Sequence, residues 1–342
     1  MSAAATPLPS AVRVRAPGRL HLGFLDPAGT LGRRFGSLGL VLDGPATVIE
    51  LRRAARDSAH ADDAAGDAEL VRATVHLATL RRATRQLAPL HLHVVETLPA
   101  HAGFGSGTQL ALAVGRAFSS LFGLALPTAE IARITGRGLR SGVGIAGFDQ
   151  GGLLLDGGPR ADGAPAALLS HLELPAAWRV LLVLDPRERG LNGVEEKAAL
   201  TMLPGLPREA AAEICHEVLM RILPGAAGAE FAPFAAGLSR MQRLLGQHFA
   251  PAQNGRVYAS AAVGRLLEWV AAHTPAGVGQ SSWGPTGFAV LPSAEAAETI
   301  VEAARAAGII DPALRLHTVR GCEHGATLET LDSLSSITTL SA

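Results

Sequence analysis

The alternation and spacing of hydrophobic residues along the chain predict a mixture of strands and helices. Short alternating or β-branched runs indicate strands, whereas apolar residues three and four positions apart indicate amphipathic helices. Strands are expected at residues 12–16, 41–51, 90–95, 178–184, 288–291 and 314–319. Helices are expected at residues 71–87, 106–122, 193–203, 207–222, 230–247, 257–273 and 294–307. The Ala- and Asp-rich segment 54–68 has no apolar period and is expected to be a surface loop.

Both halves of the chain combine strands and helices, which places the protein in the α+β or α/β class. The first half is richer in strands and the second in helices, and the loop at 157–167 is the best boundary between them. A length of 342 residues fits two domains at roughly 150 residues each. We therefore expect one domain at residues 1–170 and another at 171–342.

The charge balance argues against a polyanionic partner. The chain has 30 Lys and Arg residues against 30 Asp and Glu residues, so it lacks the basic excess of a nucleic-acid-binding protein. A local basic patch for a small anion remains possible at zero net charge. Lys197 is the only lysine, so most lysine-dependent mechanisms lack a candidate residue.

The cysteines and the hydrophobic segments indicate the compartment. Cys215 and Cys322 lie far apart in the sequence, which fits a reducing compartment and excludes a disulfide framework. The first ten residues lack the pattern of a secretory signal, and no segment meets the length rule for a membrane span. A cytoplasmic protein with no membrane partner is expected.

Two histidines fall on one face of the strand expected at 90–95. His91 and His93 are two positions apart, and a strand places such residues on the same side. They could ligate a metal ion, but no third ligand is spaced nearby. A polar face of a sheet is therefore favoured over a metal site.

The first glycine-rich segment that could carry chemistry is 99–108, between an expected strand and an expected helix. Its glycines allow close approach to a ligand, and the free N–H groups of the first helical turn suit a phosphate. The alternative is a helix entered through a flexible turn. A P-loop is excluded because this segment contains no lysine. The spacing of its glycines also differs from that of a dinucleotide-binding fingerprint. The candidate ligand-binding residues are Gly103, Gly105, Ser106, Gly107 and Thr108.

A second segment, 137–152, combines glycines with Arg140 and Asp149. The planar guanidinium of Arg140 suits a phosphate or carboxylate, with Ser141 and Gly142 beside it. Asp149 could bind Mg²⁺, act as a base or stabilise a developing cation. The alternative for Asp149 is a turn cap before a strand at residue 153.

A third segment, 279–287, is rich in glycine and hydrogen-bonding residues and precedes an expected strand. A tryptophan in such a segment suits a stacking wall, and the alternative is an ordinary loop that covers the core. The candidate residues are Gln280, Ser281, Ser282, Trp283 and Thr286.

The order of these segments resembles the GHMP superfamily, which includes galactokinase, homoserine kinase, mevalonate kinase and phosphomevalonate kinase. Residues 99–108 resemble its phosphate loop. The resemblance implies a two-domain α+β fold, with a left-handed βαβ crossover in the N-terminal domain and a ferredoxin-like C-terminal domain. Within the superfamily the chain most resembles the β-ribofuranosylaminobenzene 5′-phosphate synthases. The matching stretches are 15–26, 140–152, 191–195 and 279–286.

That resemblance implies an enzyme that joins 5-phosphoribosyl 1-diphosphate to 4-aminobenzoate or 4-hydroxybenzoate and releases CO₂ and pyrophosphate. The reaction is an early step of tetrahydromethanopterin biosynthesis, and the resemblance implies Mg²⁺ and a homodimer. An ATP-dependent small-molecule kinase and a non-catalytic sugar-phosphate binder are the alternatives.

The resemblance also suggests roles for individual residues. The 103–108 loop would bind the diphosphate, and Arg19, His21 and Arg140 would contact phosphate or carboxylate groups. Asp149 would bind Mg²⁺ or stabilise the cation, and Asp26 is a weaker candidate. The 280–286 segment would shape the aryl pocket. His21 alternates with leucines, so a plain polar strand position is its alternative.

Overall fold

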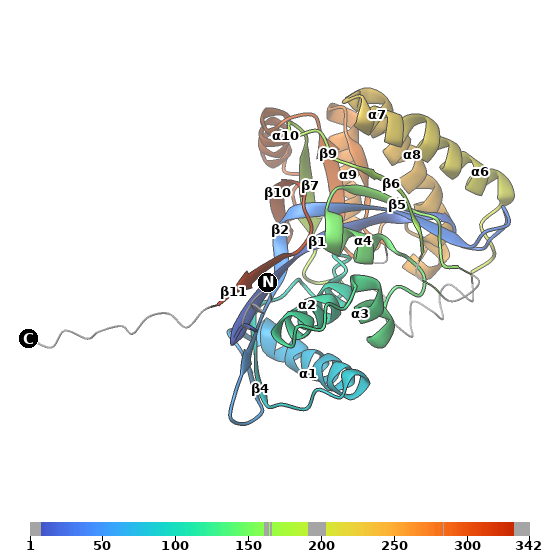
Figure 1. The fold of residues 1–342 in the computed structure, drawn as a ribbon. Coiled ribbons are helices and arrows are strands. Elements are labelled where there is room, and N and C mark those ends of the chain that lie inside the picture. The colour runs from blue at the N-terminus through green and yellow to red at the C-terminus, as the bar shows by residue number, and fades with distance from the viewer. Residues whose placement is uncertain (1–7, 161–163, 165, 191–202, 283, 332–342) are drawn as a thin grey trace, which may run out of the picture.

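A computed structural model describes residues 8–160, 164, 166–190, 203–282 and 284–331. A long antiparallel hairpin, β1 (Ala11–Asp26) and β2 (Phe35–Arg53), forms its spine (Figure 1). The sequence pattern predicted only parts of both strands. The hairpin carries bulges between Pro17 and Arg19 and between His21 and Gly23. These bulges interrupt the alternation by which a strand is recognised.

The N-terminal part of the sheet continues from β2 to β4 (Leu90–Glu96), and β3 (Ser58–Ala61) lies beyond β4 in parallel. Helix α1 (Ala64–Thr84) connects β3 to β4, so segment 54–68 is not the surface loop predicted from sequence. Asp63 caps α1 by accepting a 2.7 Å hydrogen bond from the Gly66 N–H. The short, exposed β3 shows no apolar alternation because neither of its faces is buried.

Three further helices pack on this part of the molecule: α2 (Ser106–Leu121), α3 (Thr128–Ile134) and α4 (Val143–Gln150). The apolar face of α2 covers β1 and β2, and Phe118 and Leu121 are fully buried there. Antiparallel strands β5 (Leu153–Asp156) and β6 (Leu168–Leu172) extend the sheet from β2. The domain boundary predicted at residues 170 and 171 falls within β6.

The C-terminal part has a ferredoxin-like strand order. Its strands are β7 (Arg179–Leu184), β8 (Gly277–Gln280), β9 (Gly287–Leu291) and β10 (Arg315–Gly321). They lie in the order β10-β7-β9-β8, with every neighbouring pair antiparallel. Helices α9 (Ala261–His273) and α10 (Ala294–Ala306) share a hydrophobic core with them. The predicted ferredoxin-like arrangement is therefore confirmed.

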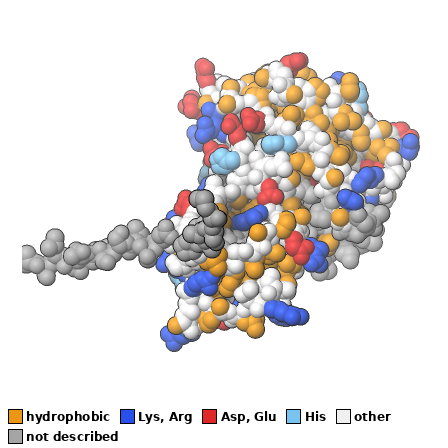
Figure 2. Space-filling view, in the orientation of Figure 1, with side chains coloured by type: hydrophobic (Ala, Val, Ile, Leu, Met, Phe, Trp, Pro, Cys, Tyr) orange, Lys and Arg blue, Asp and Glu red, His pale blue; other side chains and the backbone are white. Residues whose placement is uncertain are grey.

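A helical layer and the last strands join the two parts. Helices α6 (Arg208–Glu217), α7 (Leu223–Ala227) and α8 (Phe231–Phe249) lie together, with a π-helical turn between α6 and α7 (Figure 1). Strand β10 pairs with β2, and β11 (Thr327–Thr330) pairs with β1. The last described strand thus pairs with the first. The space-filling face in Figure 2 shows basic and acidic side chains interspersed, in keeping with the balanced charge.

Candidate active site

A pocket of 580 Å³ opens where the start of α2, strand β1 and the loop before α4 meet. Its chemistry is cationic, because Arg19, Arg72, Arg137 and Arg140 all line it. None of the described residues that line it is an aspartate or a glutamate. Its other lining residues are His21, Phe24, His101, Gly103, Gly105, Ser106, Gly107, Thr108, Gly136, Gly138, Leu139, Ser141, Ser282 and Gly284. An arginine-rich lining of this kind suits a phosphorylated or otherwise anionic ligand.

The loop at the start of α2 has the geometry predicted for a phosphate-binding loop. Gly103 and Gly105 have φ values of +94° and +75°, a left-handed conformation that favours glycine. No side chain caps the helix, and Ser106 and Gly107, whose N–H groups begin it, line the pocket. A Cβ on Gly105 would lie 2.9 Å from Arg19 Cζ, and one on Gly107 would overlap the guanidinium of Arg72. These glycines let two arginines approach the helix terminus.

Ser281 holds the phosphate loop against β1. Its hydroxyl donates a 2.7 Å hydrogen bond to the Gly103 carbonyl and accepts a 3.0 Å hydrogen bond from the His21 N–H. The next residue, Ser282, donates its N–H to the His21 carbonyl at 3.1 Å. The structure therefore brings together the β1 motif, the glycine loop and the 279–287 segment, as the sequence predicted.

His21 is buried, and neither of its ring nitrogens has a hydrogen-bond partner among the described residues. Burial, together with the nearby charges of Arg19 and Arg140, lowers the pKa of its imidazole to about 3. The ring is therefore neutral at physiological pH. It packs edge-on against Phe24, with 4.6 Å between the ring centroids. The position of His21 on the pocket wall favours a functional role over that of a plain polar strand residue.

A narrow apolar extension leads away from the arginine pocket. The two cavities share His21, Phe24 and Ser282. The extension measures 30 Å³, which is too small for an aromatic ring unless its walls move. Its remaining walls are Leu22, Gly23, Gln242, Leu245, Gly246, Phe249, Gln253, Val257, Tyr258 and Gln280. An anionic ligand in the large pocket would thus lie next to an apolar, aromatic surface.

Two of the four arginines were not identified from the sequence as pocket residues. Arg137 lies 3.1 Å from Nε2 of His76 on α1, and Arg72 forms a 2.8 Å ion pair with Glu69. Burial, together with the charges of Arg137 and Arg72, lowers the pKa of His76 to about 4. A neutral His76 can therefore accept a hydrogen bond from Arg137. No local pattern marks Arg72 as a ligand, because it lies in the polar face of an ordinary amphipathic helix.

Asp156 was also missed, and it positions the loop that carries Arg140. Its carboxylate accepts hydrogen bonds from Gly142 N (2.7 Å), Val143 N (3.1 Å) and the Ser141 hydroxyl (3.2 Å). It thereby caps the start of α4, where a negative charge is stabilising. Burial raises the pKa of this carboxyl group, and the same hydrogen bonds oppose that rise. The sequence signal that could have identified Asp156 is its position as the one polar residue at the end of the buried run 153–156.

The catalytic and metal-binding role predicted for Asp149 does not fit its position. Asp149 is exposed on the last turn of α4, where it accepts a 2.5 Å hydrogen bond from the Thr128 hydroxyl and lies 3.5 Å from Arg116. Gly144 of the same helix faces Arg19. Asp149 follows Gly144 by five residues. At about 100° per residue, its side chain therefore points well away from the face that carries Gly144. Asp149 is not among the residues that line the pocket.

Asp26 also lies outside the pocket. Its buried carboxylate accepts hydrogen bonds from the Gly29 and Leu31 N–H groups, at 2.8 and 2.7 Å. It therefore stabilises the turn between β1 and β2. Gln280 binds backbone groups and Gln253 at the narrow extension, and Thr286 is fully buried behind Ser281. Trp283 lies outside the described residues.

The described pocket residues do not form a Mg²⁺ site. Mg²⁺ in proteins is bound through carboxylates and substrate phosphates, and this lining offers arginines, two histidines and hydroxyl groups but no carboxylate among its described residues. These side chains do not match the carboxylate ligands that a protein-bound Mg²⁺ ion needs. The predicted Mg²⁺ requirement therefore has no ligand set among the described residues of the pocket.

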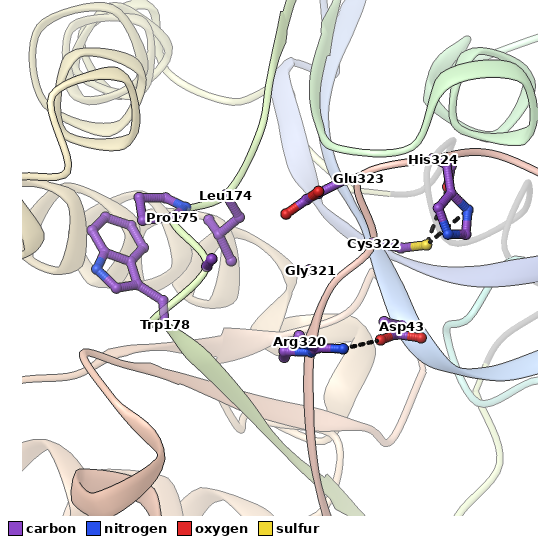
Figure 3. A pocket seen from close by; sticks show the side chains of 10 residues that line it. Asp43, Leu174, Pro175, Trp178, Arg320, Gly321, Cys322, Glu323 and His324 are labelled. Carbon is purple, nitrogen blue, oxygen red and sulfur yellow. Dashed lines mark hydrogen bonds and ion pairs between the residues drawn. The ribbon is translucent and has the colours of Figure 1, made fainter.

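A second pocket, of 160 Å³, lies between β2, β10 and the segment before β7 (Figure 3). Trp178 and Pro175 form one side, and an Arg320–Asp43 ion pair of 3.1 Å lies on the other. The thiol of Cys322 lies beside His324, but burial raises its pKa and keeps it a thiol. The mixed charges of this pocket suit a phosphorylated ligand less well than the arginine pocket does.

Comparisons with known proteins agree with this fold. The family model described as "GHMP kinases N terminal domain" matches residues 69–156, and "GHMP kinases C terminal" matches residues 227–310. The homoserine kinase from Cytophaga hutchinsonii superposes with a TM-score of 0.67 over 96% of this chain and 100% of that chain, at 16% identity. No helix among the described residues is long and apolar enough to cross a membrane. The protein is a member of the GHMP superfamily.

Two curated relatives define the family more closely. A β-ribofuranosylphenol 5′-phosphate synthase of Archaeoglobus fulgidus is 35% identical over 68% of this chain and 76% of its own length. A protein of the same name from Methanothermobacter thermautotrophicus is 26% identical over 81% of this chain and 88% of its own length. The chain belongs to the β-ribofuranosylphenol 5′-phosphate synthase family and is an enzyme. The family and fold class that the sequence motifs indicated are confirmed.

Proposed function

We propose that this enzyme transfers the ribosyl 5-phosphate group of 5-phosphoribosyl 1-diphosphate to the ring carbon of a 4-substituted benzoate. The arginine pocket beside an uncapped helix N-terminus is the observation that carries the proposal. The relatives are named for a phenol product, which makes 4-hydroxybenzoate the expected aryl acid and 4-aminobenzoate the alternative. The reaction belongs to tetrahydromethanopterin biosynthesis.

The bonding changes balance without an added oxidant or base. The bond between ribose C1 and the diphosphate oxygen breaks, and its electron pair leaves with pyrophosphate. The ring carbon that bears the carboxylate bonds to ribose C1. The bond to the carboxyl carbon then breaks, its electrons restore the aromatic ring, and CO₂ leaves.

The arrangement of charges supports a proposed position for each part of the substrates. The diphosphate would lie at the start of α2, where N–H groups, Arg19 and Arg72 converge. The benzoate would enter beside Phe24, with its carboxylate toward the arginines and its ring toward the apolar extension. Catalysis would rest on positioning and on electrostatic stabilisation of the leaving diphosphate.

His21 lies where the two substrates would meet. A neutral ring next to the cationic ribosyl centre adds no positive charge, and its ring nitrogens offer a lone pair. An imidazolium there would repel the developing cation. Burial and two arginines therefore keep His21 in the form that suits the reaction.

Mg²⁺ is proposed as part of the diphosphate substrate rather than as an ion held by the pocket. Complexed Mg²⁺ reduces the charge on a diphosphate and needs few protein ligands. We also propose that the enzyme is cytoplasmic and forms a homodimer. Sedimentation of the purified chain would test the homodimer.

The decisive experiment incubates the purified chain with Mg²⁺, 5-phosphoribosyl 1-diphosphate and carboxyl-labelled 4-hydroxybenzoate or 4-aminobenzoate. Labelled CO₂ and pyrophosphate should appear in equal amounts with one of the two acids. Arg140→Gln should abolish most of the release, whereas Arg133→Gln removes the same charge from an exposed position and should retain it. A folded wild-type chain that releases no CO₂ with either acid would refute the proposal, and ADP formation from ATP would favour a kinase.

A further inference from the structure

A cluster of histidines lies on the outer β3–β4 ribbon, away from the arginine pocket. Parallel pairing places His60 opposite His93 and Ser58 opposite His91. The rings of His60 and His93 stack with 4.0 Å between their centroids, and those of His60 and His91 with 4.9 Å. Asp62 follows β3, and its carboxylate lies 2.7 Å from His93 Nε2. One ligand atom each from His60, Asp62 and His93 lies within 4.8 Å of the others.

These three groups are the donors that zinc-like ions prefer. Two imidazoles and one carboxylate form a common protein ligand set, with the remaining position open to water. The sequence offered His91 and His93 without a third ligand. The structure supplies two further donors, His60 in β3 and Asp62 directly after it. Both lie about thirty residues before His93 in the chain. His60 and Asp62 are exposed, so their side chains can adjust to a bound ion at low cost.

The environment of His93 favours a metal ion at its Nε2 atom. Its Nδ1 atom lies 3.4 Å from the buried carboxylate of Glu50, and its Nε2 atom faces Asp62. A neutral imidazole has one N–H and can donate to only one of these carboxylates. A cation bound between Nε2 and the Asp62 carboxylate removes the need for an N–H group at Nε2. The single N–H of the ring can then lie at Nδ1 and donate to Glu50. A ligating histidine whose other nitrogen donates to a carboxylate is the usual arrangement around zinc.

Two arginines hold Glu50, the carboxylate that lies at the Nδ1 side of His93. Arg13 and Arg52 both donate hydrogen bonds to it, at 2.5 and 2.6 Å. These two hydrogen bonds hold the Glu50 carboxylate beside Nδ1 of His93.

We propose that His60, Asp62 and His93 bind one divalent transition-metal ion of the zinc class. The ion would fasten β3, whose one partner among the described strands is β4, to the rest of the sheet. It would also hold the start of α1, because Asp63 next to Asp62 caps that helix. Arg13, opposite Glu50, is six residues from Arg19 along β1, roughly 20 Å of strand. The site is thus structural and separate from the arginine pocket.

The test uses the tag-free chain, freed of metal with a chelator and titrated with Zn²⁺ by calorimetry in a phosphate-free buffer. One equivalent of Zn²⁺ should bind, and the melting temperature should rise with Zn²⁺ by linkage. His60→Gln should weaken binding by roughly tenfold or more, because it removes a direct ligand. His317→Gln, an exposed histidine on β10, should bind Zn²⁺ like the wild type.

His60 is exposed, so its replacement should leave the folded chain intact and the synthase reaction unchanged. Co²⁺ in place of Zn²⁺ should give visible absorption bands that His60→Gln loses. Absence of saturable Zn²⁺ binding by the wild type would overturn the proposal. Equal Zn²⁺ affinity of His60→Gln and the wild type would overturn it as well.

Discussion

The hydroxyl of Ser281 donates a hydrogen bond to the backbone carbonyl of Gly103, although 178 positions separate the two residues. Through this contact the C-terminal part of the chain fixes the loop that begins α2. The same hydroxyl accepts the N–H of His21, so one buried side chain sets the spacing between the phosphate loop and β1. The arginine pocket depends on that spacing.

Ser281→Ala should therefore weaken both stability and substrate binding. It removes the partner of the buried His21 N–H and one of the two donors to the half-buried Gly103 carbonyl, at a cost of about 1–3 kcal/mol. We expect a lower melting temperature and a several-fold higher KM for 5-phosphoribosyl 1-diphosphate. Ser239→Ala is the matched control, because Ser239 also joins two backbone groups, Ala276 O and Val278 N. A Ser281→Ala enzyme with unchanged KM would show that the link does not position the loop.

Gly105→Ala should impair binding of the diphosphate. The new Cβ would lie 2.9 Å from Arg19 Cζ and displace that guanidinium, and the left-handed backbone adds about 1 kcal/mol of strain. Gly308→Ala is the control, because Gly308 also has positive φ but no atom within 4 Å of its Cβ position. Both variants should lose stability, and only Gly105→Ala should raise KM by tenfold or more. Equal kinetics for the two variants would contradict this prediction.

Acid should destabilise the protein before its carboxylates are protonated. Folding lowers the pKa of His21 to about 3 and that of His76 to about 4, from an ordinary value of 6.5. The unfolded chain then binds more protons below about pH 6.5, so the free energy of unfolding falls as the pH drops through that window.

Urea unfolding at a series of pH values measures this effect. The double variant His21→Asn and His76→Asn should show a shallower fall in stability between about pH 7 and pH 5. His317→Gln should show the slope of the wild type, because this exposed histidine has no comparable environment. An unchanged slope in the double variant would mean that the two rings titrate alike in the folded and unfolded chains.

Asp156 and Asp149 should respond differently to the same substitution. Asp156→Asn weakens the cap of α4 and removes a charge from its N-terminus, which should cost about 1–2 kcal/mol and raise KM through the Arg140 loop. Asp149→Asn changes an exposed hydrogen bond to Thr128 and should leave kcat within about threefold of the wild type. Loss of turnover in Asp149→Asn alone would restore its predicted catalytic role.

Local patterns predicted the phosphate loop because glycine at positive φ and a helix start are both encoded nearby. They did not predict α4, because its two glycines disfavour a helix and tertiary packing, together with the Asp156 cap, stabilises it. Without that helix, the sequence singled out Asp149 as the functional carboxylate and did not mark Asp156. The Ser281–Gly103 contact and the His60–His93 pair depend on tertiary pairing, which spacing along the chain does not reveal.

The four arginines of the pocket have a further consequence for the rate of the reaction cycle. Guanidinium groups that attract a sugar diphosphate also attract the pyrophosphate that leaves it. Product departure is then expected to be slower than bond rearrangement, and pyrophosphate should inhibit in competition with the sugar substrate. Because salt screens such attractions, moderate ionic strength should speed turnover at saturating substrate.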